Sequence, residues 1–320
     1  MGERRSALVT GGAGFVGSHL IERLIADGWN VRVFDTRRPE GGWFEAIDQT
    51  RLEVVVADIR DAQAVASAAE GAEVIFHQAA IASVQRSIEN PQETVEVNIG
   101  GTVNVLEAAR KSGCRRVVFA SSAAVYGDGP ESPKVETLPP RPLSPYAVSK
   151  LSGEQLCAVY SHLHALETVA LRYFNVYGPR QDPSSPYSGV ISRFVDAIQK
   201  GEPVTIYGDG EQTRDFVYVS DVVEANMLAA TSDVGLATVC NVGTGKAISL
   251  KELLSELRHL FADCVRVEHL PERHGDILHS VASIEHLRSR YQFASATTLP
   301  LGLSNLLGGV ILEVADAEPK

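Results

Sequence analysis

This sequence has few of the residues that mark a secreted or metal-binding protein. Among its 320 residues are only four cysteines, far apart and without a C-x-x-C pair: Cys114, Cys157, Cys240 and Cys264. A disulfide framework and a cysteine-ligated metal are therefore not expected, and we interpret the cysteines as reduced thiols in a reducing compartment. The nine histidines also lack the spacing of metal ligands, so we expect no metal site.

Long apolar runs and an excess of positive charge are missing as well. No apolar run reaches the roughly 18 residues of a membrane-spanning helix, because the best candidate, 299–312, is interrupted by polar residues and glycines. A β-rich segment begins almost at once, so we expect no signal peptide. A net charge of −11 gives no basic footprint for nucleic acid. We expect a cytoplasmic enzyme whose partner is a small molecule, without nucleic acid or membrane.

Short β-rich segments alternate with segments of helical periodicity. The β-rich segments are 6–11, 30–35, 52–58, 73–79, 116–122, 168–174 and 238–243, and the helical ones are 16–27, 62–70, 92–112 and 147–164. This alternation, with strands that are apolar throughout, predicts a parallel sheet covered by helices on both faces. Later helices are expected at 189–200, from a Ser220-Asp221 cap to about Ala230, and at Leu250–Phe261 after a Ser249 cap.

A glycine-rich loop follows the first predicted strand and opens the first predicted helix. Gly11, Gly14 and Gly17 have the G-x-x-G-x-x-G spacing, which lets a pyrophosphate approach the backbone at a helix N-terminus. A generic tight turn would need glycine less regularly, although it remains the alternative interpretation. The position of the loop between a strand and a helix favours a dinucleotide site.

Acidic residues end the next two predicted strands. Asp35 lies where a carboxylate accepts from the adenosine ribose and repels a 2′-phosphate, which predicts NAD as the cofactor. Arg37 and Arg38, just beyond it, leave NADP as an alternative. Asp58 and Ile59 end the third strand, where they are expected to flank the adenine.

Tyr146 and Lys150 are four residues apart in a helical segment, so their side chains share one face. An ammonium beside a phenol favours the phenolate and lowers its pKa from about 10, which predicts a base usable near neutral pH. Ser122 ends the β-rich run RVVFASS. Together with the nucleotide loop, these residues can move a hydride and a proton between a sugar-like alcohol and a nicotinamide. The alternative is a helix tyrosine packed near a surface lysine.

The motifs TGGAGFVGSHL, HQAA, ASSAAVYG, YAVSK and RYFNVYGPRQ resemble the extended short-chain dehydrogenase/reductases, over about residues 6 to 290. More narrowly, the chain is similar to nucleotide-sugar epimerases that act on UDP-N-acetylglucosamine or UDP-glucose. The resemblance implies that Tyr146 removes the 4-hydroxyl proton, that Lys150 binds the nicotinamide ribose, and that Ser122 hydrogen-bonds the 4-oxygen. It also implies further cofactor-binding residues: Phe15, Val16, Ala79, Ala80, Asn98, Ala120, Ser121 and Tyr173.

On the substrate side the resemblance implies contacts from Ser83, Asn175, Arg214, Arg273, Asp276 and Val190. The two arginines would bind a diphosphate, although each could be an ordinary surface charge, and Arg214 could pair with Asp215. Val190 and Phe194 would line a uracil pocket or simply pack in the core. Ser280 is similar to a small gatekeeper that admits N-acetylated sugars, and a shift of one position would place His279 or Val281 there.

The pair of residues after Ser122 distinguishes between reactions. Dehydratases and decarboxylases similar to this chain carry an acid in that pair, whereas Ala123 and Ala124 stand here, which favours epimerisation. A uronate 4-epimerase, a 4,6-dehydratase and a 4-ketoreductase remain alternatives, as does a non-catalytic NAD-sensing binding module.

The alternation of strands and helices together with the resemblance predicts a Rossmann-type doubly wound parallel sheet and a smaller C-terminal α/β domain. We expect residues 1–174 and about 212–243 to bind NAD, about 175–211 and 244–320 to bind a nucleotide sugar, and a homodimer to form through helices near 91–112 and 146–164.

Overall fold

The computed structural model describes residues 5–182, 189–234, 237–261, 265–271 and 278–308. Its main element is a seven-stranded sheet in the order β11-β6-β5-β4-β1-β2-β3. Every neighbouring pair of strands in this sheet is parallel. The strands are β1 (Ser6–Thr10), β2 (Asn30–Asp35), β3 (Leu52–Val56), β4 (Val74–His77), β5 (Arg116–Ser122), β6 (Glu167–Tyr173) and β11 (Thr238–Val242).

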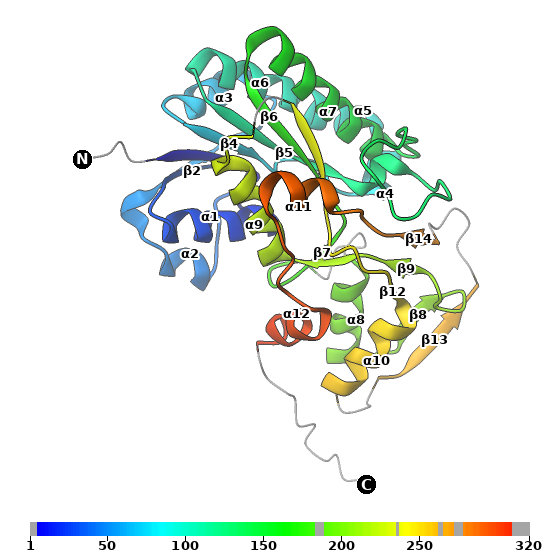
Figure 1. Cartoon of the computed structure of the whole chain (residues 1–320). Coiled ribbons are helices and arrows are strands. Elements are labelled where there is room, and N and C mark those ends of the chain that lie inside the picture. Colours follow the sequence, from blue (N-terminus) through cyan, green and yellow to red (C-terminus); the bar gives the residue numbers. More distant parts are fainter. Residues whose placement is uncertain (1–4, 183–188, 235–236, 262–264, 272–277, 309–320) are drawn as a thin grey trace.

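Helices cover both faces of this sheet (Figure 1). One face carries α3, α6 and α7, and the other carries α1, α9 and α11. The bounds are α1 (Phe15–Ala26), α3 (Ala62–Ala69), α6 (Gly101–Ser112), α7 (Pro145–His164), α9 (Val219–Thr231) and α11 (Glu285–Tyr291). Shorter helices are α2 (Gly42–Ala46), α4 (Val84–Glu89) and α5 (Pro91–Val95), with single turns at Gln49–Arg51 and Ala123–Tyr126.

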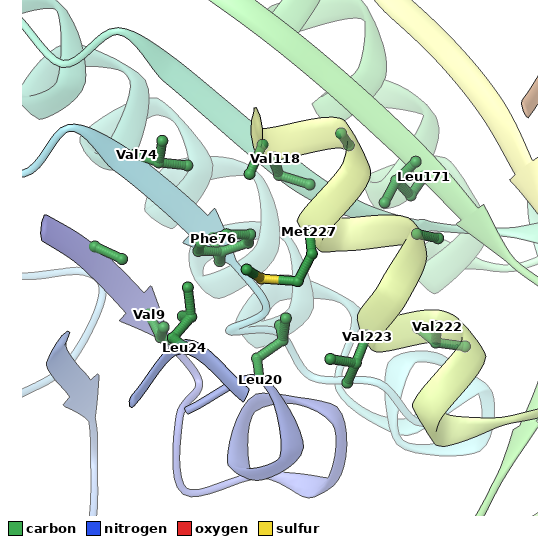
Figure 2. Close-up of a cluster of buried hydrophobic side chains, with 14 of the residues drawn as sticks. Val9, Leu20, Leu24, Val74, Phe76, Val118, Leu171, Val222, Val223 and Met227 are labelled. Carbon is green, nitrogen blue, oxygen red and sulfur yellow. The ribbon is translucent and has the colours of Figure 1, made fainter. Parts of the chain in front are cut away.

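Alternate residues of each strand supply two separate cores. On β1, Leu8 packs with α3 and α6, whereas Val9 packs against α1. Figure 2 shows the second core, in which Met227 of α9 points into the space between Phe76 and Leu20. Burial on both faces explains why these strands read as continuous apolar runs.

A second body of structure lies beside the carboxyl ends of the sheet (Figure 1). It contains two strand pairs, β10-β7 and β13-β8, and a three-stranded sheet in the order β12-β9-β14. Its apolar core is formed largely by α8, α10 and α12. The bounds are β7 (Asn175–Tyr177), α8 (Val190–Gln199), β8 (Val204–Tyr207), β9 (Thr213–Arg214), β10 (Phe216–Tyr218), β12 (Ile248–Ser249), α10 (Leu250–Leu260), β13 (Val267–Leu270), β14 (His279–Ser280) and α12 (Leu299–Leu306).

Two helix boundaries differ from the sequence-based predictions. The helix predicted over 92–112 is divided, because a π-helical turn at Glu96–Gly100 separates α5 from α6. The predicted Ser220-Asp221 cap is wrong: the cap is Tyr218, and Asp221 instead accepts from Ser295 and Thr297. Ser249, by contrast, forms the predicted cap of α10, in a reciprocal pair with Glu252.

Candidate active site

A cavity of about 790 Å³ opens at the carboxyl ends of the main sheet. Open α/β sheets bind ligands at this edge, where the loops after the strands diverge. The β1–α1 loop and the ends of β2, β3, β4 and β5 contribute to its wall. Helix α7 contributes Tyr146 and Lys150. The cavity therefore brings the glycine loop and the predicted tyrosine–lysine pair to one site.

The glycine loop has the shape of a phosphate cradle. Gly11 has φ of +70°, and its amide donates to the Phe34 carbonyl at 2.8 Å. A Cβ on Gly11 would lie 2.6 Å from the Ala79 nitrogen, and one on Gly17 would lie 2.2 Å from the Gly11 oxygen. The loop can therefore keep this path only without side chains at these positions. Gly14 begins α1, which directs unpaired amides and the positive end of the helix dipole towards the cavity.

Asp35 lines the cavity and also holds the loop in place. One carboxylate oxygen accepts from the Ala13 amide at 2.9 Å, and Arg37 donates back to the Ala13 carbonyl at 3.0 Å. Asp58 accepts two hydrogen bonds from the Arg60 guanidinium, while Ile59 lies buried beneath Gly101. The acidic ends of β2 and β3 are thus both part of the cavity wall.

Ser122, Tyr146 and Lys150 come together although Ser122 lies on a different element. The Ser122 hydroxyl accepts from the Ala124 amide at 3.1 Å and hydrogen-bonds the Tyr146 phenol. The Lys150 ammonium donates to the Ala120 carbonyl at 2.8 Å and lies 5.8 Å from the centre of the Tyr146 ring. The end of β5 therefore contributes a hydroxyl, and one turn of α7 contributes a phenol and an ammonium.

The predicted direction of the Tyr146 pKa is wrong for this structure. Burial raises the pKa of the phenol, and the hydrogen bond with Ser122 opposes that rise only in part. The ammonium of Lys150 lies over the ring rather than against the hydroxyl, so it compensates weakly for the lost hydration. Burial also lowers the pKa of Lys150 to about 8.

A buried polar network that sequence reasoning missed supports the wall beside Tyr146. Gln78 donates to the Tyr173 hydroxyl at 3.1 Å, and Asn226 of α9 donates to the same oxygen at 2.8 Å. Gln78 and Tyr173 line the cavity, while Asn226 is fully buried behind them. Gln78 was visible in the HQAA motif, but nothing in the sequence around Asn226 indicated that it reaches this site.

Asn98 has a supporting position and is not among the residues that line the cavity. Its amide side chain bonds both the amide and the carbonyl of Ile81 and donates to Ser149. Ser83 does line the cavity, and its hydroxyl caps α4 by accepting from the Arg86 amide. The other predicted cofactor-binding residues that line it are Phe15, Val16, Ala79, Ala80, Ala120 and Ser121.

Four of the predicted substrate residues, Asn175, Val190, Arg214 and Ser280, lie on the second body. Ser280 and Arg214 are register partners on β14 and β9, so these two predicted residues are adjacent. Asn175 donates to the Asp215 carbonyl at 3.1 Å. The Asp215 carboxylate accepts from Thr244, Gly245 and Ala282, so its oxygens are engaged away from the predicted Arg214 pairing.

The remaining predicted substrate residues are less informative. Val190 begins α8 and packs with Phe194 against the core of the second body. Arg273 and Asp276 lie outside the described residues. Within the described ranges, no helix is long and apolar enough to cross a membrane.

The site as a whole fits a dinucleotide. The tight glycine loop, which has no room for side chains at Gly11 and Gly17, suits a pyrophosphate, Asp35 lies where a ribose would be accepted, and Lys150 lines the same cavity. Fold and site therefore define a Rossmann-type enzyme that uses a nicotinamide dinucleotide.

Comparison with known proteins identifies the family. The model of the NAD dependent epimerase/dehydratase family matches residues 7–243, so the chain belongs to that family. A UDP-glucose 4-epimerase of Mycolicibacterium smegmatis is 41% identical over 288 residues, which cover 88% of this chain and 90% of the relative. The predicted family, Rossmann-type fold, enzyme class and NAD cofactor are confirmed.

Two solved structures extend the comparison. A UDP-N-acetylglucosamine 4-epimerase from Methanobrevibacter ruminantium, in complex with UDP-N-acetylmuramic acid, has a TM-score of 0.87 at 35% identity and matches 95% of this chain and 97% of its own. A UDP-glucose 4-epimerase from Thermus thermophilus, in complex with NAD, has a TM-score of 0.84 at 39% identity and matches 97% of this chain and 100% of its own. The matches span both bodies of the structure.

Proposed function

We propose that this protein is a UDP-sugar 4-epimerase that interconverts UDP-N-acetylglucosamine and UDP-N-acetylgalactosamine, with UDP-glucose and UDP-galactose as further substrates. The observation that carries the proposal is the convergence of Ser122 and Lys150 on Tyr146, which lines the dinucleotide cavity together with Lys150. The names of the three proteins compared above differ in the sugar and agree on a UDP-sugar and a 4-epimerase.

The residues divide the proposed chemistry among them. Bound NAD would supply the acceptor for the hydride of C4 of the sugar and the donor that returns it to the opposite face. Tyr146 removes the proton from the 4-hydroxyl, and Ser122 donates to the same oxygen and relays its proton. Lys150 binds the nicotinamide ribose and adds positive charge beside the ring of Tyr146. The sugar turns over in the site as a 4-keto intermediate, so no net oxidation occurs and NAD stays bound.

The two residues after Ser122 favour epimerisation over elimination. Ala123 and Ala124 provide no acid or base there. The nearest carboxylate along α7, that of Glu154, is buried in an ion pair with Arg172 at 2.7 Å. In the cavity wall, Glu93 is paired with Arg86. Dehydration or decarboxylation would need a carboxyl group that is not already committed in this way.

The register of β9 and β14 supports a role for Ser280 in sugar selection. If Arg214 binds the diphosphate, its strand neighbour Ser280 lies within reach of the attached sugar, and a small side chain leaves room for an acetamido group. We predict that Ser280→Tyr lowers kcat/KM for UDP-N-acetylglucosamine by roughly 10-fold or more and changes that for UDP-glucose much less. Parallel steady-state assays of both substrates check this, with Ser289→Tyr on the exposed part of α11 as control; equal losses for the two sugars would remove Ser280 from this role.

A single incubation tests the proposed reaction. Purified protein with UDP-N-acetylglucosamine and no added nucleotide is expected to form the 4-epimer, resolved by chromatography. A 4-keto-6-deoxy sugar would indicate a dehydratase, a requirement for added reductant would indicate a ketoreductase, and turnover of only UDP-glucuronate would indicate a uronate epimerase. Absence of any product with bound NAD would favour the NAD-sensing module.

We also propose that two copies associate through α4, α5 and α7. These helices contact one another, and large apolar side chains on them are exposed in the single chain: Val84, Ile88, Val95, Val148, Val159 and Leu163. Exposed apolar groups concentrated on neighbouring helices indicate a covered face. Light scattering should give twice the monomer mass of 34.4 kDa, and a monomer mass would contradict the pairing.

A further inference from the structure

The ring of Phe119 lies beneath the ammonium of Lys150. Phe119 is on β5, three residues before Ser122, and its ring centre is 5.1 Å from the Lys150 Nζ atom. Phe119 is 2% exposed and Lys150 is 5% exposed, so the contact is almost completely removed from water. A cation over the face of a desolvated aromatic ring is attracted by the ring quadrupole.

Lys150 has few other groups to compensate its charge. Its ammonium donates to the Ala120 carbonyl, and the Tyr146 ring is its other aromatic contact within the described ranges. In the described part of the chain, no carboxylate forms an ion pair with the Lys150 ammonium. Glu154, one turn further along α7, is paired with Arg172 instead. An ammonium buried without a carboxylate is costly unless other groups stabilise the charged form.

The helix that carries Lys150 is shaped around this ring. Residue 153 is a glycine in the middle of α7, a position where glycine stabilises a helix less than alanine does. A Cβ at Gly153 would lie 2.3 Å from the Cζ atom of Phe119. The glycine therefore lets α7 approach β5 closely enough for the ring to lie under the ammonium.

Other charged or titratable groups face this region from the elements packed around Lys150. They are His77 on β4, Tyr146 and Glu154 on α7, Arg172 and Tyr173 on β6, Arg86 on α4 and Glu93 on α5. His77 is held between Thr10 and Thr102, and burial lowers its pKa to about 3. Burial raises the pKa of Tyr173 to about 12, and Arg86 and Glu93 pair with each other. His77 and Tyr173 therefore keep their charge state between about pH 5 and pH 10.

We infer that Phe119 is a positioning residue of the active site: its ring face, admitted by Gly153, holds the Lys150 side chain in its charged form at the end of the cavity. The role assigned to Lys150 belongs to the proposed epimerase, but the contact itself does not depend on which reaction the enzyme performs. Replacing the ring by an aliphatic side chain would remove the attraction and leave the ammonium with the Ala120 carbonyl and the ring of Tyr146.

The test is a titration of Lys150 in the intact, NAD-loaded protein. Lysine labelled with ¹³C at Cε is followed by NMR against pH, and the Lys150 signal is assigned by its loss in Lys150→Arg. We expect Phe119→Leu to lower the pKa of Lys150 by about 1 unit, because the neutral amine does not need the ring. In the same variant, the fall of kcat at high pH should move to lower pH by a similar amount, with KM for the UDP-sugar nearly unchanged.

The matched control is Phe76→Leu. Phe76 is as fully buried, on the neighbouring strand β4, but it packs on the opposite face of the sheet (Figure 2). It should cost comparable stability and leave the Lys150 titration where it is in the parent protein. If Phe119→Leu does not fold, Phe119→Met makes the same comparison with a longer, more flexible side chain that also lacks the ring.

A Lys150 titration that moves no more in Phe119→Leu than in Phe76→Leu would overturn the inference. The NMR titration needs no substrate, so it separates this inference from the proposed reaction. If the parent protein has no epimerase activity but Phe119→Leu lowers the pKa of Lys150, the proposed function is rejected and the role of Phe119 is kept. If the parent protein is an epimerase but the pKa of Lys150 does not move, the function is kept and the role of Phe119 is rejected.

Discussion

Tyr146→Phe is expected to lower kcat by about 100-fold or more, because general acid–base groups contribute factors of this size. The substitution removes one oxygen from the cavity wall and leaves the ring that contacts the Lys150 ammonium. We propose that the glycine loop and the ends of the first strands hold NAD, so it should remain bound at the parent stoichiometry. Steady-state kinetics and the absorbance of NAD released on denaturation measure the two quantities.

Tyr160→Phe is the matched control for this prediction. Tyr160 lies on the same helix α7, and its hydroxyl donates to Glu107 on the surface side at 2.9 Å. The same atom is removed from the same helix, yet kcat should stay close to the parent value. Turnover by Tyr146→Phe within a few-fold of the parent protein would remove Tyr146 from its role as the base.

Glu154→Ala is expected to lower the free energy of unfolding by about 3–5 kcal/mol. Arg172 donates to both oxygens of Glu154, at 2.8 and 2.7 Å, and Ser121 donates to the same carboxylate. The two side chains are 4% and 5% exposed, so the substitution would leave a buried guanidinium without its counter-charge. Urea denaturation at fixed protein concentration and saturating NAD measures the change.

Two further variants show whether the missing counter-charge is the cause. Glu285→Ala removes one side of the exposed Glu285–Arg288 pair and should cost less than about 1 kcal/mol. Replacing both Glu154 and Arg172 by leucine should recover part of the loss, because no unpaired charge then remains in the core. A cost of Glu154→Ala no larger than that of Glu285→Ala would show that this ion pair does not stabilise the fold.

The main sheet could be predicted because both of its faces are buried. The central strands β1, β4 and β5 read as short, largely apolar runs, and the helices between the strands repeat their apolar residues at helical spacing. The glycine loop could also be predicted, since the geometry of the turn excludes side chains at Gly11 and Gly17. Both features depend on residues that are neighbours in the sequence, so they could be predicted without knowledge of distant contacts.

The parts that sequence could not predict depend on distant residues. The direction of the Tyr146 pKa follows from burial, which depends on how the whole cavity wall closes around the phenol. Asn226 reaches Gln78 from 148 residues away, and Asn98 clamps Ile81 rather than lining the cavity. Tyr218 is the N-cap of α9 without a side-chain hydrogen bond to the helix, so the capping rule predicted the wrong residue.

The proposed catalytic residues and their surroundings could be predicted only in part. Tyr146 and Lys150 were linked by their spacing on one helix, and Ser122 by its place at the end of a strand. The ring of Phe119 beneath Lys150 was not predictable, because 31 residues separate the two and only the packing of α7 on β5 brings them together. Arg273 and Asp276, which the resemblance implies to be substrate contacts, lie outside the described residues.

The fate of the hydrogen on C4 tests the central claim most directly. UDP-N-acetylglucosamine carrying deuterium at C4 is incubated with the purified protein in ordinary water, and the product is analysed by NMR and mass spectrometry. If the hydrogen is taken up within the closed site and handed back to the other face, UDP-N-acetylgalactosamine will retain deuterium at C4. Deuterium lost to water, or a product unchanged in configuration at C4, would contradict the account.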